Sequence, residues 1–354
     1  MGIYSVEELE TYCVGILTKN GMEKENIDIL VKLLLQANLE GVDSHGISRF
    51  PVYIKRFNDH RISLNPDVQF EQRSSSILLV DGDNGIGHLV GHLAVQKGIT
   101  MAKENGVAVV SIRNSNHFGA ASNFCKTACE ENMACIAFTN SPPGIAPWGG
   151  TEAYFGTNPI AFGFPTKDRP PVIIDLSTST VARGKIILAE KQGKSIPEGW
   201  AIDEYGMPTT NASEALQGSV LPLGGAKGAA LAMAVEILSG VLTGAAFGPE
   251  VKSIYEENEK GKANVGHFFI LMDIEKFMDI HVFLQSMQGL LGGIKSTRKA
   301  SGVEEIRIPG ERRHRESEKR KIEGIFLPTE VENELRRLAE EHEVRFPDCH
   351  LHRS

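Results

Sequence analysis

Three short apolar runs, separated by two stretches of helical periodicity, constrain the fold of this chain most strongly. The runs at 77–80, 107–110 and 134–138 are typical of buried strands, and 87–105 and 119–131 have helical spacing. This alternation predicts an α/β fold. Further strands are expected at 159–164, 172–175 and 267–272, with an apolar helix at 226–243, and we expect the sheet to be mixed.

The chain begins with helices rather than strands. Ser5 and Glu8 form a capping box, and the apolar residues from Ile27 to Leu35 follow helical spacing up to Gly41. A charged helix is predicted at 329–343, whose Leu335 and Leu338 pack back on the first lobe. We therefore expect a helical lobe of residues 1–73, completed by 279–354, and an α/β domain of residues 74–278.

Charge and cysteine usage exclude several classes of partner. The net charge is −8, and the basic run at 312–321 is interrupted by Glu316 and Glu318, which argues against nucleic acid. No segment has the roughly 20 consecutive apolar residues that span a membrane, and no secretory signal is recognised at the start. Five cysteines without CxxC spacing fit reduced thiols in the cytoplasm. Although Cys349, His350 and His352 offer soft ligands, a metal site is not expected at a loose terminus.

Common nucleotide and hydrolase motifs fail here. At Gly85, Gly87 and Gly91 the third glycine comes one residue too late for GxGxxG, so an ordinary Rossmann site is not expected. The segment 289–296 lacks the Gly-Lys pair of a phosphate loop and is predicted to be helical, and GxSxG does not occur. The segment 191–225 is rich in Gly, Pro, Ser and Thr, which predicts a long ordered excursion with little regular structure.

A histidine and an arginine stand four residues apart in the segment 43–51. At helical spacing, His45 and Arg49 share a face. An imidazole exchanges a proton near neutral pH, and a guanidinium grips a carboxylate with two hydrogen bonds, so the pair fits a substrate with a carboxylate beside a reactive oxygen. The alternative is that Asp43 and Ser44 cap a helix, with Arg49 in a surface ion pair.

A second polar cluster, residues 113–119, follows a predicted strand and precedes a helix. His117 in this cluster could act as a general acid or base, and the backbone N–H groups near Gly119 could receive a phosphate. The alternative is that His117 only caps the helix.

Polar turns elsewhere could meet a dinucleotide or be plain turns. These are the segments 139–143, 149–150 and 156–159, the strand end at 175–180, and the helix start at 224–228, where Lys227 favours a phosphate or a ribose.

Seven segments in this order resemble one protein family. They are DSHGISR at 43–49, NSNHFG at 114–119, FGTNPIAFGFP at 155–165, DLSTST at 175–180, IPEGWAID at 196–203, GMPTT at 206–210 and LPLGGAKG at 221–228. Together they resemble the malate/L-lactate dehydrogenase family of the non-Rossmann type, which includes ureidoglycolate and sulfolactate dehydrogenases and a cyclic imine reductase. The likeness extends through Arg307 to Glu311.

This resemblance implies a mixed-sheet, non-Rossmann domain for cofactor and substrate, and a homodimer with its active site near the subunit interface. It makes His117 the proton acceptor and places Ser44, His45 and Arg49 at the substrate, with Arg49 as carboxylate clamp and His45 as a second proton-transfer candidate. The expected cofactor contacts are Ser141, Asp175, Leu176, Ser177, Lys227, Pro309, Gly310 and Glu311.

The expected reaction is hydride transfer between a nicotinamide cofactor and a small L-2-hydroxy acid, with malate or lactate preferred. Reduction of a cyclic imine carboxylate and oxidation of ureidoglycolate are alternatives, and a non-catalytic nucleotide sensor is an alternative of another class. NAD is preferred over NADP. Ala226, which stands where the family often has an aromatic residue, and Lys191 and Lys194, as potential phosphate partners, leave that choice open.

Overall fold

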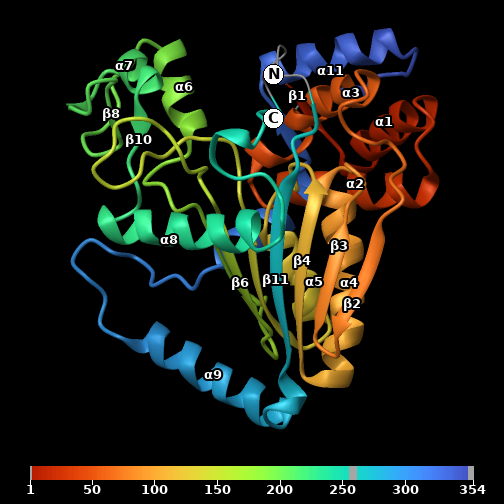
Figure 1. The fold of residues 1–354 in the computed structure, drawn as a ribbon, viewed down its shortest axis with the longest axis vertical. Helices are drawn as coiled ribbons and strands as arrows, with labels where there is room; N and C mark the ends of the chain where they lie inside the picture. Colours follow the sequence, from red (N-terminus) through yellow and green to blue (C-terminus); the bar gives the residue numbers. More distant parts are fainter. Residues whose placement is uncertain (1, 255–260, 350–354) are drawn as a thin grey trace.

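A seven-stranded sheet forms the centre of the computed structural model, which describes residues 2–254 and 261–349 (Figure 1). Across the sheet the strands are β2 (Gln69–Ser74), β3 (Ile77–Asp81), β4 (Val107–Ser115), β11 (Val265–Asp273), β5 (Met133–Thr139), β6 (Ile160–Phe164) and β7 (Val172–Leu176). The pair β3 and β4 is parallel, and the other neighbouring pairs are antiparallel. The predicted mixed α/β fold is therefore confirmed.

Two helices cover one face of the sheet. The helix α4 (Gly87–Asn105) spans the residues predicted for it and packs on β4 and β11, where Gly98 leaves room for Leu271. The helix α5 (Ser122–Glu130) packs on β5 and β6 and is shorter than expected. Its start is delayed because Gly119 has a φ of +74°, which belongs to a turn.

The opposite face is crossed by α8 (Ala226–Glu236), which continues as a π-helical turn, η3 (Ile237–Val241). The turn lies directly against β11, where Gly266 admits the backbone of Ser239. The apolar helix predicted at 226–243 is thus present, with its last turn rewound by this close packing.

The helical lobe contains α1 (Val6–Lys19), α2 (Lys24–Leu39), α3 (Phe50–Asn58) and α11 (Thr329–Glu341). The capping box of Ser5 and Glu8 forms as predicted. Leu335 is fully buried in this lobe, and the Tyr12 hydroxyl donates to its carbonyl at 2.7 Å, which confirms that α11 packs back on the first helices. The ends of the chain also meet here, because β1 (Gly2–Tyr4) pairs with β12 (Ile325–Leu327).

The segment from 279 onward is divided between the helical lobe and the far end of the sheet. The helix α10 (Glu311–Glu323) packs on α2, whereas α9 (Ile280–Ser296) extends from the far end of the sheet, away from the helical lobe (Figure 1). The division of the chain at residues 73/74 and 278/279 stays a prediction.

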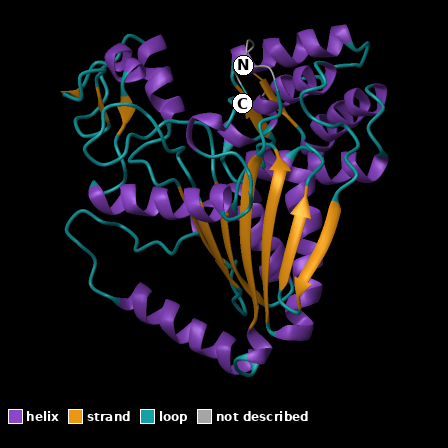
Figure 2. Ribbon diagram, in the orientation of Figure 1, coloured by secondary structure: helices purple, strands orange, loops and turns teal. Residues whose placement is uncertain are grey.

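The segment expected to have little regular structure contains a small lobe of its own (Figure 2). Within the segment lie β8 (Ala201–Ile202), β9 (Pro208–Thr209), α7 (Ala212–Gln217) and β10 (Ser219–Val220), and the strands are ordered β10-β8-β9. The helix α6 (Arg183–Lys191), which ends where the segment begins, packs on α7. Two-residue strands are too short for alternating hydrophobicity to reveal them. Short 3₁₀ turns elsewhere are η4 (Gly248–Glu250) and η5 (Ile274–Lys276).

The described residues contain no helix long and apolar enough to cross a membrane. Within the same residues, no group of three or more His, Cys, Asp or Glu side chains is placed to hold a metal ion. His350 and His352 lie outside the described part of the chain.

Candidate active site

The segment between α2 and α3 folds as two successive 3₁₀ turns, η1 (Asp43–His45) and η2 (Ile47–Arg49). The expectation that His45 and Arg49 share one helical face is wrong, because Gly46 interrupts the turns with φ −97° and ψ −146°. A Cβ on Gly46 would meet the Asn38 amide oxygen at 2.1 Å. The Arg49 side chain nevertheless folds back on the first of the two turns, because its Nε donates to the Ser44 carbonyl at 2.6 Å. We call residues 43–49 the substrate turn.

The capping alternative for this turn is not supported by the contacts. The Ser44 hydroxyl lies 2.9 Å from Nδ1 of His45, and no side-chain cap is formed at η1 or α3. The Asp43 carboxylate accepts hydrogen bonds from Asn38 and Arg320 instead.

His117 follows β4, as predicted, and faces the substrate turn. Its ring is stacked on that of His45, with centroids 5.6 Å apart and planes at 26°. Nδ1 of His117 lies 2.6 Å from the hydroxyl of Tyr53 on α3. The first turn of α5 has no side-chain cap, so His117 does not cap that helix. Sequence reasoning missed Tyr53, although it comes four residues after Arg49.

A third histidine lies behind this pair. His88 on α4 is fully buried, with its ring centroid 5.6 Å from Tyr53 and 6.3 Å from His117. A Cβ on Gly119 would come within 2.3 Å of Nε2 of His88, so this ring fills the space beneath the His117 loop. The residue belongs to the failed glycine fingerprint, and nothing in that pattern indicated its place.

Burial keeps these imidazoles neutral. It lowers the pKa of His117 well below the ordinary value, and the nearby His45, His88 and Arg49 lower it further. Burial is also the main reason that the pKa of His45 falls to about 4, with a contribution from Arg49. Both rings are therefore unprotonated near pH 7, the state in which an imidazole can accept a proton.

Several of the predicted cofactor contacts lie on adjoining loops. The Ser141 hydroxyl accepts from the Thr157 amide at 3.0 Å, and the Thr178 amide donates to the Thr157 carbonyl at 2.9 Å. The Leu223 amide in turn donates to the Thr178 carbonyl at 2.8 Å. Lys227 follows on the exposed first turn of α8, which begins at Ala226 after Gly225 and has no side-chain cap. The N–H groups of that turn therefore favour a negatively charged ligand.

Three more of the predicted contacts lie at the end of β7. The Asp175 carboxylate accepts hydrogen bonds from the Ser122 amide at 3.2 Å and from Arg313 at 3.0 Å. Sequence reasoning missed Arg313. Leu176 is 38% exposed at the strand end. Ser177 follows it, and its hydroxyl donates to the Ser179 carbonyl at 3.2 Å.

The Pro309 to Glu311 turn lies beside the same strand. The Ile173 amide donates to the Pro309 carbonyl at 3.3 Å. Gly310 has a φ of +99°, and a Cβ there would lie 2.9 Å from the Pro171 carbonyl oxygen. Glu311 is held by Lys295 at 2.5 Å, so its carboxylate is already paired.

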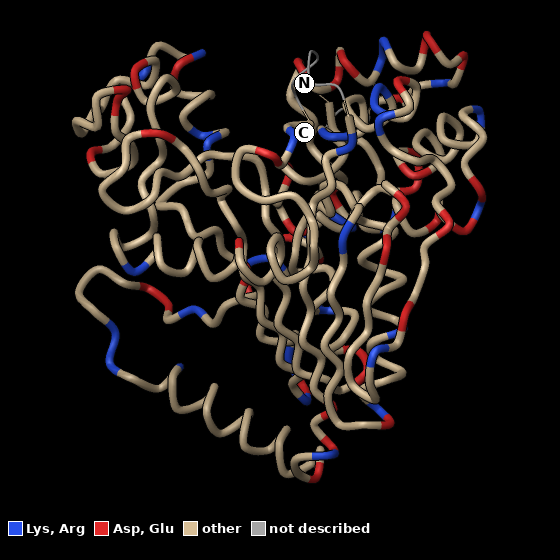
Figure 3. The backbone as a smooth tube through the Cα atoms, in the orientation of Figure 1, with Lys and Arg blue, Asp and Glu red and all other residues tan. Residues whose placement is uncertain are grey.

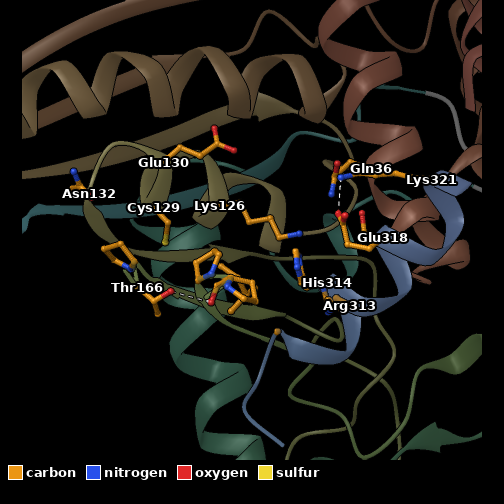
Figure 4. Close-up of a pocket in the computed structure, with 16 residues that line it drawn as sticks. Gln36, Lys126, Cys129, Glu130, Asn132, Thr166, Arg313, His314, Glu318 and Lys321 are labelled. Atoms are coloured by element: carbon orange, nitrogen blue, oxygen red, sulfur yellow. Dashed lines mark hydrogen bonds and ion pairs between the residues drawn. The ribbon is translucent and has the colours of Figure 1, made fainter. Parts of the chain in front are cut away.

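A cavity of about 290 Å³ lies beside this turn, bounded by α5, the β6–β7 connection and α10 (Figure 4). Gly310 and Arg313 contribute to its wall, as do Lys126 and His314. Its lining does not include His45 or His117, so it adjoins the predicted cofactor segments rather than the histidine pair.

Comparison with known proteins identifies the family. The family model described as malate/L-lactate dehydrogenase matches residues 4–336. The chain belongs to the malate/L-lactate dehydrogenase family. Relatives of this family include the malate dehydrogenase of Pyrococcus horikoshii, which is 39% identical over 94% of this chain and 93% of its own length.

Two other relatives in the malate/L-lactate dehydrogenase family differ in the cofactor that they are named for. The (2R)-3-sulfolactate dehydrogenase (NADP(+)) of Chromohalobacter salexigens is 38% identical, over 95% of this chain and 97% of that protein. The ureidoglycolate dehydrogenase (NAD(+)) of Escherichia coli is 31% identical, over 92% and 93%. Membership of this family makes the chain an NAD(P)-dependent oxidoreductase.

Solved structures from the same family share the fold. The sulfolactate dehydrogenase of Methanocaldococcus jannaschii superposes with a TM-score of 0.91 at 38% identity, covering 97% of this chain and 98% of that one. The malate dehydrogenase of Entamoeba histolytica gives 0.92 at 31% identity, covering 98% and 99%. The delta1-piperideine-2-carboxylate reductase of Pseudomonas syringae gives 0.85 at 30%, covering 96% and 100%.

Proposed function

We propose that this chain transfers hydride between a nicotinamide dinucleotide and C2 of a small L-2-hydroxy acid, with malate or lactate as the preferred substrate. The observation that carries the proposal is the convergence of the substrate turn on His117. Two stacked imidazoles lie 5.6 Å apart, and Arg49 is near enough to lower the pKa of both. This arrangement supports a proposal in which an imidazole accepts the proton while the neighbouring guanidinium binds the carboxylate.

His117 accepts the hydroxyl proton of the substrate in this proposal. In the tautomer with a proton on Nδ1, that N–H donates to the Tyr53 oxygen at 2.6 Å, which leaves Nε2 as the acceptor. His45, whose Nδ1 lies 2.9 Å from the Ser44 hydroxyl, is the second candidate for proton transfer. Arg49 binds the C1 carboxylate, and this binding fixes C2 relative to His117.

The adjoining loops described above suit a dinucleotide. Ser141, Ser177 and Asp175 offer hydroxyl and carboxylate groups for ribose, the uncapped start of α8 with Lys227 favours a phosphate, and Leu176 offers an exposed apolar side chain to a flat ring. Pro309, Gly310 and Glu311 complete the proposed contacts along β7. The nicotinamide ring supplies the hydride acceptor when bound. We propose NAD as the cofactor, with NADP as the alternative.

A single assay tests the reaction. NADH and NADPH are each mixed with a panel of 2-oxo acids, and absorbance of the reduced nicotinamide is followed. We expect oxaloacetate or pyruvate to consume NADH fastest. His117→Ala should lower kcat far more than cofactor affinity. Failure to consume either cofactor with any member of the panel would contradict the proposal.

Reduction of a cyclic imine carboxylate is the second candidate. It is favoured by the fold shared with the piperideine carboxylate reductase, and such a substrate also presents a carboxylate for Arg49. Adding Δ1-piperideine-2-carboxylate to the panel, and ureidoglycolate with NAD in the oxidative direction, separates these substrates. A non-catalytic sensor would bind cofactor without consuming it under any of these conditions.

We further propose that the protein acts in the cytoplasm as a homodimer joined through α8, η3 and α9. Charged residues are sparse along these elements (Figure 3), and each exposes large apolar side chains. Met233, Val241 and Leu290 are 49%, 56% and 58% exposed. A second copy of the chain is the proposed partner. Light scattering at micromolar concentration should give twice the chain mass of 38.6 kDa, and a monomer would count against the interface.

A further inference from the structure

The helix α10 contacts both parts of the proposed site. Near its start, Arg313 donates to Asp175 at 3.0 Å and to the Ser122 hydroxyl at 2.6 Å. Seven residues further on, Arg320 donates to Asp43 in the substrate turn. Seven residues are nearly two helical turns, or about 10 Å, so both guanidinium groups lie on one side of one rigid element. The same helix therefore touches a predicted cofactor segment and the substrate turn.

The contact between Arg320 and the substrate turn has a fixed geometry. Nη1 and Nη2 of Arg320 donate to the two carboxylate oxygens of Asp43, at 2.6 and 3.1 Å. Nη1 also donates to the Asn38 carbonyl at 2.7 Å, and Nε donates to Glu316 at 2.7 Å. The Arg320 side chain is only 16% exposed. A two-pronged pair of this kind fixes orientation as well as distance.

The groups that Arg320 holds form the frame of the turn. The Asn38 amide donates to Asp43 at 2.8 Å and its oxygen accepts from the Ile47 amide at 2.7 Å. The Ser48 hydroxyl donates to the Asp43 carbonyl at 2.6 Å. Ser44 and His45 lie in the stretch of chain that these hydrogen bonds hold, and Arg49 directly follows it. Movement of α10 against α2 would therefore change the place of the groups proposed to bind substrate.

We propose that Arg320 is a positioning residue that couples cofactor binding to substrate binding through α10. Cofactor held at Asp175 and the Pro309 to Glu311 turn fixes the start of the helix, and Arg320 then holds the substrate turn in its binding orientation. The cofactor thereby raises the affinity for a carboxylate substrate. The inference rests on the proposed function, and it adds a residue that touches neither substrate nor cofactor.

The test measures this coupling directly. The dissociation constant of NADH, or of NADPH if it binds better, is measured by fluorescence with and without saturating oxamate, an unreactive amide analogue of a 2-oxo acid. In the unmodified protein the two constants should differ by about five- to 150-fold. In Arg320→Met the ratio should fall toward one, whereas the constant without oxamate should change less than about twofold. Arg320→Lys, which loses the two-pronged pair, should fall between them.

Lys319→Met is the matched control, because Lys319 lies next to Arg320 on α10 but forms an exposed pair with Glu323. It should keep the full ratio. If Arg320→Met does not fold, Asp43→Asn removes the other half of the pair and should give the same loss.

Two results would overturn the inference: a ratio of one in the unmodified protein, or an unchanged ratio in the folded Arg320 and Asp43 variants. Either result, obtained with normal turnover of a 2-oxo acid, leaves the proposed function standing. Loss of all turnover in the unmodified protein contradicts the proposed function instead.

Discussion

Removal of one hydroxyl group tests the arrangement around His117. Tyr53 is fully buried, and its hydroxyl lies 2.6 Å from Nδ1 of His117. Tyr53→Phe keeps the ring, and with it the packing against His88, while it removes this hydrogen bond. The variant therefore separates the hydrogen bond from the apolar contacts of the same side chain.

The expected loss follows from the change in charge during the reaction. When His117 accepts a proton, its Nδ1–H becomes part of a cation, and hydrogen bonds to charged groups are about twice as strong as neutral ones. A buried donor left without its partner costs about 1–3 kcal/mol. Since about 1.36 kcal/mol corresponds to tenfold in rate, kcat should fall by about five- to 150-fold. The Kd of the cofactor should stay within about twofold.

Initial rates of oxidation of the best 2-hydroxy acid, the direction in which His117 accepts the proton, give kcat and KM for the variant across a range of pH. Tyr12→Phe is the matched control, because the Tyr12 hydroxyl is also buried and donates to the Leu335 carbonyl at 2.7 Å, in the helical lobe. It should lower thermal stability without lowering kcat. The reasoning is refuted if Tyr53→Phe retains kcat within about twofold, or if Tyr12→Phe loses as much activity.

Three more predictions follow from the same region. Arg49→Lys loses both the hydrogen bond to the Ser44 carbonyl and the two-pronged grip on a substrate carboxylate. Steady-state kinetics should therefore show KM raised about tenfold or more with kcat little changed, and an unchanged KM would contradict the role of Arg49 in binding the carboxylate. Burial lowers the pKa of His88 to about 3, so the folded state disfavours its protonation, and stability is lost as pH falls below the unfolded value of about 6.5. At pH 5 this cost is about 2 kcal/mol. In urea titrations, His88→Gln should therefore narrow the difference in unfolding free energy between pH 7 and pH 5 by about that amount, and a difference as large as the parent's would contradict the prediction. Gly119→Ala would place a Cβ 2.3 Å from His88 at a residue with a φ of +74°. Differential scanning calorimetry should therefore show a lowered Tm, and activity assays should show a lowered kcat. A variant with the Tm and kcat of the parent would count against this packing.

Local patterns were sufficient for the elements whose apolar residues repeat over many positions. The predicted strands at the centre of the sheet, the bounds of α4, and the position of His117 after β4 all follow from such periodicity. The elements that the sequence did not predict have little apolar periodicity. In α10 only Ser317 is buried among thirteen residues, so its sequence looks like a charged run. The strands β1 and β12 are three residues each and are defined by pairing between the two ends of the chain.

The sequence by itself determined that the chain forms an α/β fold of this family and which segments carry histidine, arginine and hydroxyl groups, because side-chain type and periodicity are local properties. Tertiary structure alone decided which of these groups meet. Tyr53 and His117 are 64 residues apart, and Asp43 and Arg320 are 277 apart. Such partners are chosen by how α3, α4 and α10 pack against the sheet and one another, and that packing depends on the shapes of surfaces assembled from the whole chain.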